Sequence, residues 1–491
     1  MSVVLPALVA RARTDPDHRA LVCNDEPLSY AELVRMIAAA SGRFANAGVE
    51  PGRTAAVLIA SRAHAWVVHL ALQSLGLDTL QIADLSDLEA LKLPGLDYVA
   101  TRTAWPERLR LPDGASGLRH INLRPLERDD LPPSLDGVEL PIGGAHLMST
   151  SGTTGSVKQV RFAPAMQAVR AEAHARLMQF GPDSVVYVGR LPLWTSVGVA
   201  DPISVWQAGG TVVLDQARPR RTAFHPERGG LLTHAMLTVP ALAEVLAAKE
   251  EALAFNPSLR LVIGASPLPW RAAEEAMRRL TPNLFARLGI TETGTVAITP
   301  VKAPGDQLAH AVDPSRQVES VGDGDAPLPA ETVGRLRIRS EPGDVFGYIG
   351  DAASTRAHFR DGWFYPGDLA AVGVDGRVRL HGRANEVINL RGMKIPTLPI
   401  EQAVLAAVPA RDACLLIETG PDGEDETRLV LEIDRPLVGA ELRRLYEAAA
   451  PLRPNLNRMD VFPRNEMGKV DRIEMRRRLD RSAKARETAP A

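Results

Sequence analysis

Residues 148–158, Met-Ser-Thr-Ser-Gly-Thr-Thr-Gly-Ser-Val-Lys, decide how this chain is to be understood. Glycine allows backbone angles that turn successive N–H groups inward, and hydroxyl side chains add donors and acceptors. Inward N–H groups form a concavity that binds anions, and the final lysine adds positive charge. The segment therefore predicts a loop that holds phosphate oxygens. Its predicted phosphate-binding residues are Ser149, Thr150, Ser151, Gly152, Thr153, Thr154, Gly155 and Lys158.

The spacing differs from that of the better-known phosphate loop, in which four residues separate a glycine from Gly-Lys-Ser/Thr. Here Gly152 and Gly155 are too close, and Lys158 comes three residues later. The alternative for such a segment is a flexible Ser/Thr/Gly linker. The motifs that follow along the chain favour the phosphate loop.

Composition limits the classes of protein to consider. With 491 residues, 45% of them hydrophobic and 24% charged, the chain has the make-up of a globular protein of two or three domains. A net charge of −2 gives no electrostatic footprint for nucleic acid. Cys23 and Cys414 lie too far apart to indicate a disulfide framework or a zinc site. The sequence shows no signal peptide and no membrane span, so a cytoplasmic protein is expected.

The N-terminal part alternates helix and strand patterns. Ser29 and Glu32 form a capping box that opens a helix ending near Gly48, and a buried strand at 55–59 precedes a helix at 63–75. This alternation predicts an α/β layer structure. Residues 102–144 are rich in Pro, Gly and Asp and are expected to form surface loops.

In the central part, several predicted strands end in segments rich in Gly, Pro and Thr. The strands are 185–188, 259–263 and 285–288, and the segments are 191–196, 264–269 and 289–294. Ligands bind at the carboxyl ends of strands in open α/β sheets, so these segments are expected to line one crevice. Glu292 would there be placed to hold a divalent cation against phosphates, whereas the alternative is a surface carboxylate in a turn.

The sequence pattern changes towards the C-terminus. Asp368 follows Gly367 in a turn, where its carboxylate can accept hydrogen bonds from both ribose hydroxyls; ordinary turn chemistry is the alternative. Residues 382–386 form a polar joint, which predicts one domain at 1–381 and a small α+β domain at 382–491. A basic helix is expected at 472–481, either as a solvated face or as a contact for a phosphorylated partner.

Together these segments resemble the adenylate-forming superfamily, which includes acyl-CoA synthetases, adenylation domains and luciferase-type enzymes. The resemblance covers roughly residues 28–479 and is carried by the 148–158 loop, Gly289-Ile290-Thr291-Glu292, Gly367-Asp368, Gly382-Arg383 and Gly468-Lys469. It implies an α/β fold, with a large N-terminal core of several subdomains and a small hinged α+β C-terminal domain.

The resemblance also implies roles for individual residues. The loop would hold the β- and γ-phosphates of ATP, Thr291 would contact the α-phosphate, Glu292 would bind Mg²⁺, and Lys469 would be the catalytic lysine of adenylation. The remaining implied residues are Gly264, Ala265, Ser266 and Leu288 at the adenine and acyl site, Asp368 and Arg383 at the ribose, Trp194, Thr195, Gly198 and Gly289 at the acid, Asn385 at the hinge, and Gly392 and Lys394 facing the thiol acceptor.

The implied reaction brings negative charge against negative charge. A carboxylate attacks the α-phosphorus of ATP and pyrophosphate leaves, so cations must hold both partners. A thiol then attacks the acyl-adenylate and AMP leaves. A hinged small domain would supply Lys469 for the first step and the 391–394 face for the second.

Some positions depart from the family pattern. Leu288 stands where an aromatic residue usually stacks on adenine, and Asn385 stands in place of the hinge aspartate. Val157, Gln159 and Pro366 also differ from the usual residues. None of these departures removes a charge that is assigned to phosphate or Mg²⁺.

The side chains near position 195 bear on the acid. Thr195 stands where the similar amino-acid adenylation domains carry an aspartate that pairs with the substrate ammonium. Because Thr195 supplies no such charge, the resemblance disfavours an α-amino acid. Trp194, Val197, Gly198, Ile203 and Leu288 indicate an apolar pocket for a fatty, branched or aryl acid, although ordinary core packing explains them equally.

We therefore expect an ATP-dependent acyl-CoA synthetase that uses ATP, Mg²⁺ and CoA. One alternative is transfer of the acyl group to the phosphopantetheine arm of an acyl carrier protein. Another is a weakly active nucleotide-binding homologue, against which the retention of Glu292 and Lys469 argues.

Overall fold

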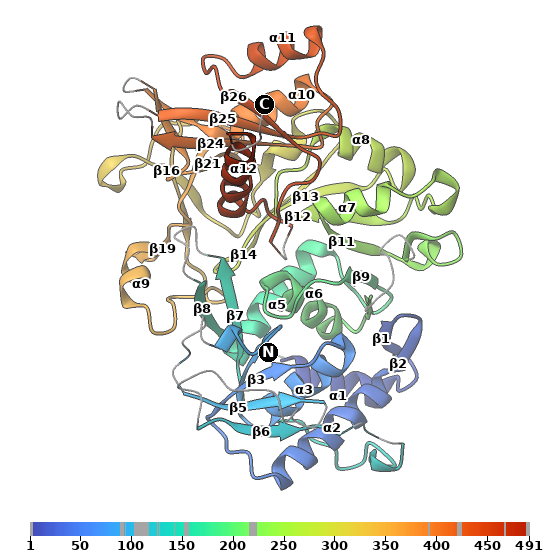
Figure 1. Ribbon diagram of the computed structural model, residues 1–491. Helices are drawn as coiled ribbons and strands as arrows, with labels where there is room; N and C mark the ends of the chain where they lie inside the picture. The colour runs from blue at the N-terminus through green and yellow to red at the C-terminus, as the bar shows by residue number, and fades with distance from the viewer. Residues whose placement is uncertain are drawn as a thin grey trace.

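The computed structural model describes residues 3–88, 93, 95–102, 117–124, 126, 128–141, 143–151, 157–215, 223–390, 393–419, 425–465 and 468–487. Figure 1 shows the N-terminal elements at one end of the molecule, the C-terminal unit at the other, and the central part of the chain between them. Helices α5 (Pro164–Met178) and α6 (Ser196–Gln207) lie at the centre, side by side.

The larger sheet presents the strand ends that were expected to form the site. In spatial order its strands are β14 (Gly294–Pro300), β13 (Leu284–Ile290), β12 (Arg260–Gly264), β11 (His234–Thr238), β9 (Val185–Gly189), β10 (Thr211–Leu214), β1 (Arg19–Cys23) and β2 (Glu26–Ser29). Strands β9, β11, β12 and β13 run parallel, so the segments after β9, β12 and β13 leave the sheet at one edge. The expected convergence of these strand ends is confirmed.

A second sheet carries the 148–158 segment. Its strands are β6 (Arg119–Asn122), β5 (Leu96–Thr101), β3 (Thr54–Leu58), β4 (Asp78–Gln81), β7 (His146–Ser151) and β8 (Val157–Phe162). Helices α1 (Val4–Thr14), α2 (Tyr30–Asn46) and α3 (Arg62–Ser74) join α5 and α6 in the hydrophobic core that both sheets share. The rings of Trp66 and Trp206 meet edge to face in this core, with centroids 5.0 Å apart.

The outer face of the larger sheet is covered by α7 (Val239–Leu246) and α8 (Trp270–Arg279), which bury a separate cluster against it. Side chains alternate between the two faces of a strand. Ala286 of β13 therefore packs towards α7 and α8, while Phe285 packs towards the shared core. By the same alternation Arg287 faces α5 and α6.

A third, largely antiparallel sheet follows in sequence. It contains β15 (Ala309–Ala311), β21 (Arg377–Arg383), β20 (Asp368–Val372), β17 (Gly334–Arg339), β19 (Trp363–Phe364) and β18 (Phe359–Arg360), with β16 (Val318–Val321) paired to β17. The short helix α9 (Ala352–His358) precedes β18.

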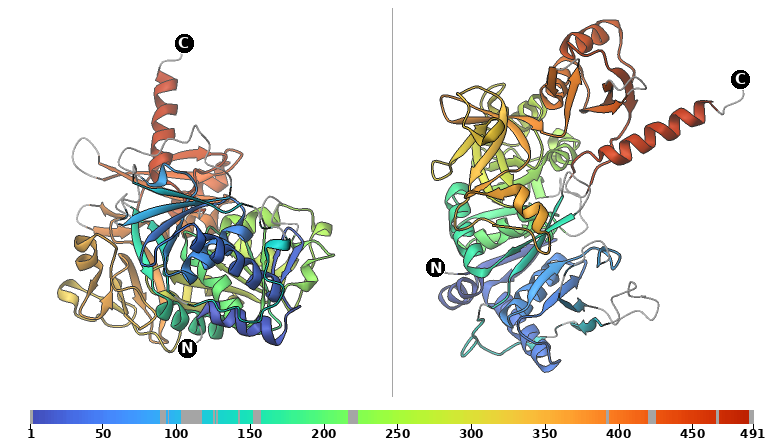
Figure 2. Two further views of the ribbon diagram at one scale, coloured as in Figure 1. Left: turned by 90° about the horizontal axis from the view of Figure 1, so that it is seen from below. Right: turned by 90° about the vertical axis from the view of Figure 1, so that its left-hand side faces the viewer.

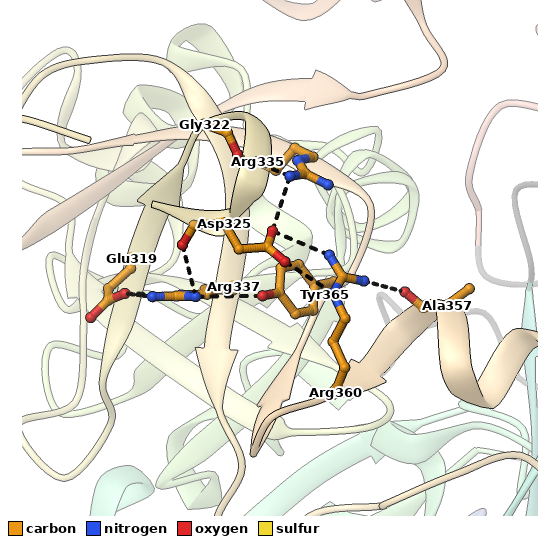
Figure 3. A network of polar contacts seen from close by, with 8 residues as sticks. All are labelled: Glu319, Gly322, Asp325, Arg335, Arg337, Ala357, Arg360 and Tyr365. Atoms are coloured by element: carbon orange, nitrogen blue, oxygen red, sulfur yellow. Dashed lines mark hydrogen bonds and ion pairs between the residues drawn. The ribbon is translucent and has the colours of Figure 1, made fainter. Parts of the chain in front are cut away.

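A polar network fixes the edge of this sheet against α9 (Figure 3). Asp325 accepts hydrogen bonds from Arg335 Nη2 at 2.9 Å and Arg360 Nε at 3.1 Å, and its carbonyl oxygen accepts one from Arg337 Nη1 at 3.2 Å. The Arg360 guanidinium also lies 3.6 Å from the centroid of the Tyr365 ring. The network thereby fixes the segment that runs from α9 to Asp368.

The C-terminal unit has its own core. Its strands are β22 (Val387–Leu390), β23 (Met393–Pro396), β24 (Asp412–Thr419), β25 (Asp425–Glu432) and β26 (Asn455–Met459), and its helices are α10 (Thr397–Ala407), α11 (Gly439–Ala448) and α12 (Arg472–Glu487). Figure 2 shows α12, the expected basic helix, projecting from the body of the molecule. The domain boundary at 382 stays a prediction, since β21 continues across it to Arg383.

The structure tests two of the sequence predictions for the N-terminal part. The capping box is confirmed, since Ser29 Oγ accepts from Glu32 N at 3.2 Å and Ser29 N donates to the Glu32 carboxylate at 2.8 Å. The interpretation of 102–144 as loops alone was wrong, because β6 pairs with β5 there. Only Ile121 of that short strand is buried, so its sequence carries little alternation. Within the described residues no helix has the length and hydropathy to cross a membrane.

Candidate active site

The predicted phosphate loop is flanked by a β-hairpin. Ser149 and Thr150 lie on β7, and Thr150 pairs with Lys158 on β8. Gln159 Nε2 donates to Ser149 Oγ at 2.9 Å across the hairpin. Ser151 ends β7, whereas Gly152, Thr153, Thr154 and Gly155 lie outside the described residues.

Lys158 is held by a histidine that sequence analysis did not single out. Its Nζ lies 2.9 Å from His358 Nε2 and 4.8 Å from the centroid of the Tyr348 ring. His358 Nδ1 donates to the carbonyl oxygen of Tyr365 at 2.7 Å, which leaves Nε2 as the acceptor for Lys158. Burial lowers the pKa of Lys158, and the charges of Glu292 and Asp351 oppose this shift.

Thr291 and Glu292 lie in the turn between β13 and β14. Glu292 is 6% exposed, and its Oε1 accepts a hydrogen bond from Tyr348 Oη at 2.7 Å. Its Oε2 has no hydrogen-bond partner among the described residues. A shielded carboxylate with one free oxygen suits a divalent cation that completes its coordination with phosphate oxygens and water. No group of three or more His, Cys, Asp or Glu side chains able to hold a metal occurs in the described ranges.

Two arginines, the buried Arg170 and the half-buried Arg316, hold the backbone of this turn. Arg170 Nη1 donates to the carbonyl of Thr291 at 2.8 Å, Nη2 to that of Glu292 at 2.7 Å, and Nε to that of Gly343 at 3.1 Å. Arg316 Nη2 donates to the carbonyl of Thr293 at 2.5 Å.

Asp344 neutralises this pair of guanidiniums. Its side chain is 1% exposed, and its oxygens accept from Arg316 at 2.6 and 2.8 Å. The nearest nitrogen of Arg170 is 3.9 Å from the same carboxylate. The two arginines thus hold the consecutive backbone carbonyls of the turn, and the Glu292 side chain stays available to the site.

Asp368 and Arg383 face each other on neighbouring strands. They are paired across β20 and β21, with Arg383 Nε 3.2 Å from Asp368 Oδ1. Arg383 Nη1 also donates to the carbonyl of Pro366 at 2.8 Å. Burial raises the pKa of Asp368, whereas Arg383 and Lys469 lower it. The structure therefore brings these two predicted ribose-binding residues together.

Lys469 reaches this site from the C-terminal unit. Its pKa is lowered by burial and by Arg383, whereas Asp368 and Glu292 raise it, so its charge lies among all three groups. A Cβ added at Gly468 would lie 2.6 Å from Pro240 Cγ of α7, so the lysine segment is packed against the N-terminal core. Only glycine fits there, also because its φ is +74°.

The segment after β12 contains a strained residue. Ala265 has φ +72°, in the left-handed region, which costs an alanine about 1–2 kcal/mol. Such strain clusters at functional sites. Ala265 follows Gly264 and precedes Ser266, which places these predicted adenine-site residues at the same sheet edge as Glu292. Leu288 packs against the cluster formed around Val296 and Leu336.

The residues predicted for the acid lie at the start of α6. Thr195 caps this helix: its Oγ1 accepts from Gly198 N at 3.2 Å and donates to the carbonyl of Pro192 at 2.7 Å. A Cβ at Gly198 would lie 2.0 Å from that carbonyl oxygen, so Gly198 is needed for packing. Trp194 accepts from Ser149 N at 3.1 Å through its carbonyl, and Ile203 is buried in the shared core.

Charged groups that sequence analysis missed lie beside this acid site. Asp201, on α6 one turn beyond Gly198, is fully buried and bonded to Arg287 and His174. Arg287 underlies Gly289, the other predicted acid residue. The periodicity of α6 places Asp201 on the face of Gly198, but no sequence signal identifies its partners.

The remaining predicted residues lie on the C-terminal side of the joint. Asn385 is exposed in the turn between β21 and β22. Lys394 is exposed on β23, and Gly392 lies outside the described residues. The groups whose charges act on Lys469 do not include Lys394. The hinge and acceptor roles stay predictions.

The chain is similar to known proteins, both in one part and over nearly its whole length. Residues 143–348 match the AMP-binding enzyme family. The chain is 25% identical to a 2-succinylbenzoate–CoA ligase of Bacillus licheniformis, over 95% of this chain and 98% of the ligase. It is 28% identical to a feruloyl-CoA synthase of Amycolatopsis, over 96% of this chain and 98% of the synthase.

A solved structure shows the same fold. The o-succinylbenzoate CoA synthetase of Bacillus subtilis, in complex with its acyl-adenylate intermediate, superposes with a TM-score of 0.79 at 20% identity, and the match covers 96% of this chain and 97% of that one. The expected α/β architecture is confirmed. Residues 143–348 thus match the AMP-binding enzyme family, and nearly the whole chain is similar to CoA ligases of that kind.

Proposed function

We propose that this chain is an acid–thiol ligase, which uses ATP to activate a carboxylic acid as an acyl-adenylate and then transfers the acyl group to CoA. The position of Lys469 carries the proposal, since a cation of the C-terminal unit lies among Asp368, Arg383 and Glu292 of the core. Acid activation needs such a cation between two anionic partners. The full-length similarity to CoA ligases supports the same reaction.

Each group has a part in that reaction. Asp368 and Arg383 bind the ribose hydroxyls, and Lys158 with the 149–155 loop binds the terminal phosphates. Glu292 would hold Mg²⁺, which would supply positive charge against the phosphates. Lys469 donates to the attacking carboxylate and to the α-phosphate, which orients them for in-line attack and stabilises the leaving pyrophosphate.

The second half-reaction requires another arrangement. The acyl-adenylate is attacked at its carbonyl by a thiolate, and AMP leaves with the electron pair. We place the hinge at Asn385, so that rotation withdraws Lys469 and presents the face of Gly392 and Lys394. We also propose that the protein is located in the cytoplasm.

The decisive experiment supplies ATP, Mg²⁺ and a panel of fatty, branched, aryl and dicarboxylic acids, with and without CoA, and identifies products by mass. An acyl-CoA from one class of acid supports the proposal. An acyl-adenylate that CoA does not consume would instead assign an acyl carrier protein as the acceptor. ATP binding without adenylate from any acid would contradict acid activation and leave the nucleotide-binding homologue.

A further inference from the structure

The acid site contains a buried guanidinium that the chemistry above does not use. Arg287, on β13, has a side chain only 7% exposed. Its Nη1 donates to Asp201 Oδ1 at 3.0 Å and more weakly to Oδ2 at 3.4 Å. Its Nε is buried without a hydrogen-bond partner among the described residues, and Nη2 has none among them either. Nε and Nη2 form the edge of a guanidinium that pairs with both oxygens of a carboxylate.

The orientation of Arg287 is fixed by a chain of polar groups from different elements. Asp201 of α6 accepts from His174 Nε2 of α5 at 2.6 Å, and His174 Nδ1 lies 3.1 Å from Thr295 Oγ1 of β14. Asp201 accepts only, so His174 carries its proton on Nε2 and accepts from Thr295. Burial tends to raise the pKa of Asp201, but Arg287 and His174 hold it below its ordinary value. The carboxylate that anchors Arg287 is therefore ionised.

Two glycines, Gly264 and Gly289, border the Arg287 side chain. A carbon added at Gly289 would lie 3.5 Å from Arg287 Nε and 3.5 Å from the carbonyl oxygen of Gly294, with no closer contact. A carbon added at Gly264 would also approach no atom closer than 3.5 Å, and its nearest neighbour is Arg287 Cβ. These are ordinary van der Waals contact distances, so a carbon atom fits at either glycine without displacing the Arg287 side chain.

The balance of buried charge favours an anion at the free edge of Arg287. In the described part of the chain, the charges of Arg287 and Arg316 act on Arg170, while Asp201 pairs with Arg287 and Asp344 pairs with Arg316. Glu292 is the further carboxylate nearby, and it is assigned to Mg²⁺. A buried guanidinium with unpaired donors is costly, and an oxyanion removes that cost.

We infer that Arg287 binds a second carboxylate of the acid substrate, so that the chain activates one carboxyl group of a dicarboxylic acid. This inference rests on the proposed function and names its substrate class. One carboxylate attacks the α-phosphorus and pyrophosphate leaves with the bonding electrons. The other keeps its charge, stays paired with Nε and Nη2 of Arg287, and takes no part in bond making.

The test compares acids that differ only in that charge. Pyrophosphate release is measured with terephthalate and its monomethyl ester, and with hexanedioate and its monomethyl ester. We expect kcat/KM to be about ten- to a hundredfold higher for at least one dicarboxylate than for its half ester, as for a charged hydrogen-bonded pair. Arg287→Met should erase this ratio, and Arg287→Lys should keep part of it.

The matched control is Arg260→Met, on the neighbouring strand, whose guanidinium lies 3.8 Å from the centroid of the Phe285 ring. It should keep the ratio. Equal rates with acids and half esters in the unaltered chain would overturn the inference, as would an Arg287→Met variant that slows both equally.

Binding without ATP separates this inference from the proposed function. Calorimetry with the same acids and half esters should show tighter binding of a dicarboxylate that Arg287→Met abolishes. If that binding occurs but no acid yields pyrophosphate, the proposed function fails and the assignment of Arg287 stands. If pyrophosphate is released and binding does not depend on Arg287, the assignment of Arg287 fails and the function stands.

Discussion

Arg170 and Arg287 are both buried arginines that face the space between α5, α6 and the β13–β14 hairpin, but their donors are used differently. Each donor nitrogen of Arg170 meets a backbone carbonyl, including those of Thr291 and Glu292. Arg287 is anchored by one nitrogen to Asp201, and its other edge meets no protein acceptor in the described residues. A guanidinium whose three nitrogens all donate to backbone carbonyls holds structure, whereas one with an unpaired edge can recognise a ligand.

The carboxylates beside these two arginines, Asp344 and Asp201, also differ in how fully hydrogen-bond donors surround them. Asp344 accepts from Arg316 on both oxygens and from Glu341 N at 2.9 Å, so it is surrounded by donors. Asp201 accepts its short bonds on Oδ1, and among the described residues its Oδ2 contacts only Arg287, at 3.4 Å. The Asp344 cluster should therefore tolerate substitution less well than the Asp201 cluster.

The largest effect is expected from Asp344→Asn. The amide would place N–H donors against Arg316 or Glu341 N and would leave two guanidiniums without a counter-charge. We expect a loss of about 3–5 kcal/mol in the free energy of unfolding, measured by urea titration. A loss below about 1 kcal/mol would show that the two arginines do not depend on this carboxylate.

The next largest effect is expected on the Mg²⁺ dependence of pyrophosphate release. Arg170→Lys keeps the charge but can no longer hold the carbonyls of Thr291, Glu292 and Gly343 together. We expect the Mg²⁺ concentration for half-maximal pyrophosphate release to rise about tenfold, as expected when one supporting contact of a metal site is lost. Arg176→Lys, an exposed substitution on the same helix, is the control. An unchanged Mg²⁺ dependence would mean that the turn is held without Arg170.

Asp201→Asn should be milder than Asp344→Asn. Its amide oxygen can keep the Oδ1 bonds to His174 and Arg287, and its nitrogen replaces only the 3.4 Å contact. We expect a loss of about 1–3 kcal/mol from weaker, uncharged hydrogen bonds, in the same urea titration. A cost equal to that of Asp344→Asn would contradict the difference between the clusters.

The smallest effect is a change in acid sensitivity. Burial lowers the pKa of His174 and Arg287 lowers it further, so folded His174 stays neutral where the unfolded chain takes up a proton, below about pH 6.5. The unfolded state then binds more protons, and stability falls as the pH falls. Arg287→Met removes one cause of the lowered pKa, so the loss of stability between about pH 7 and about pH 5 should be smaller. Arg271→Met, at an exposed position on α8, should match the unaltered chain; an equal loss in all three would contradict this coupling.

Sequence predicted the parts of the site that are carried by contiguous motifs. Local patterns of glycine, hydroxyl and charged residues mark four such motifs. They are the 148–158 segment, the Thr291–Glu292 turn, Gly367-Asp368 and Gly468-Lys469. The charges of Glu292 and Arg383 act on both Lys158 and Lys469, and the charge of Asp368 acts on Lys469. Their catalytic and binding roles remain proposals.

The sequence could not predict which residues hold the site residues in position. Arg170, Asp344, His358 and Arg287 act through partners on other elements, so no local spacing marks them. Arg287 also lies in an apolar strand pattern whose neighbours suggested only a hydrophobic pocket. Its partners emerge when α5, α6 and β13 pack together, because register and helix rotation decide which polar groups meet.

The most direct test of the account is exchange of labelled pyrophosphate into ATP, with the acid that the chain prefers, before and after Lys469→Ala. We predict acid-dependent exchange that falls at least about a hundredfold in the variant, because a positioned cation is lost from the transition state. Lys302→Ala, at an exposed position outside the site, should retain the exchange. Undiminished exchange in the Lys469→Ala variant would contradict the claim that this lysine joins the acid to the nucleotide.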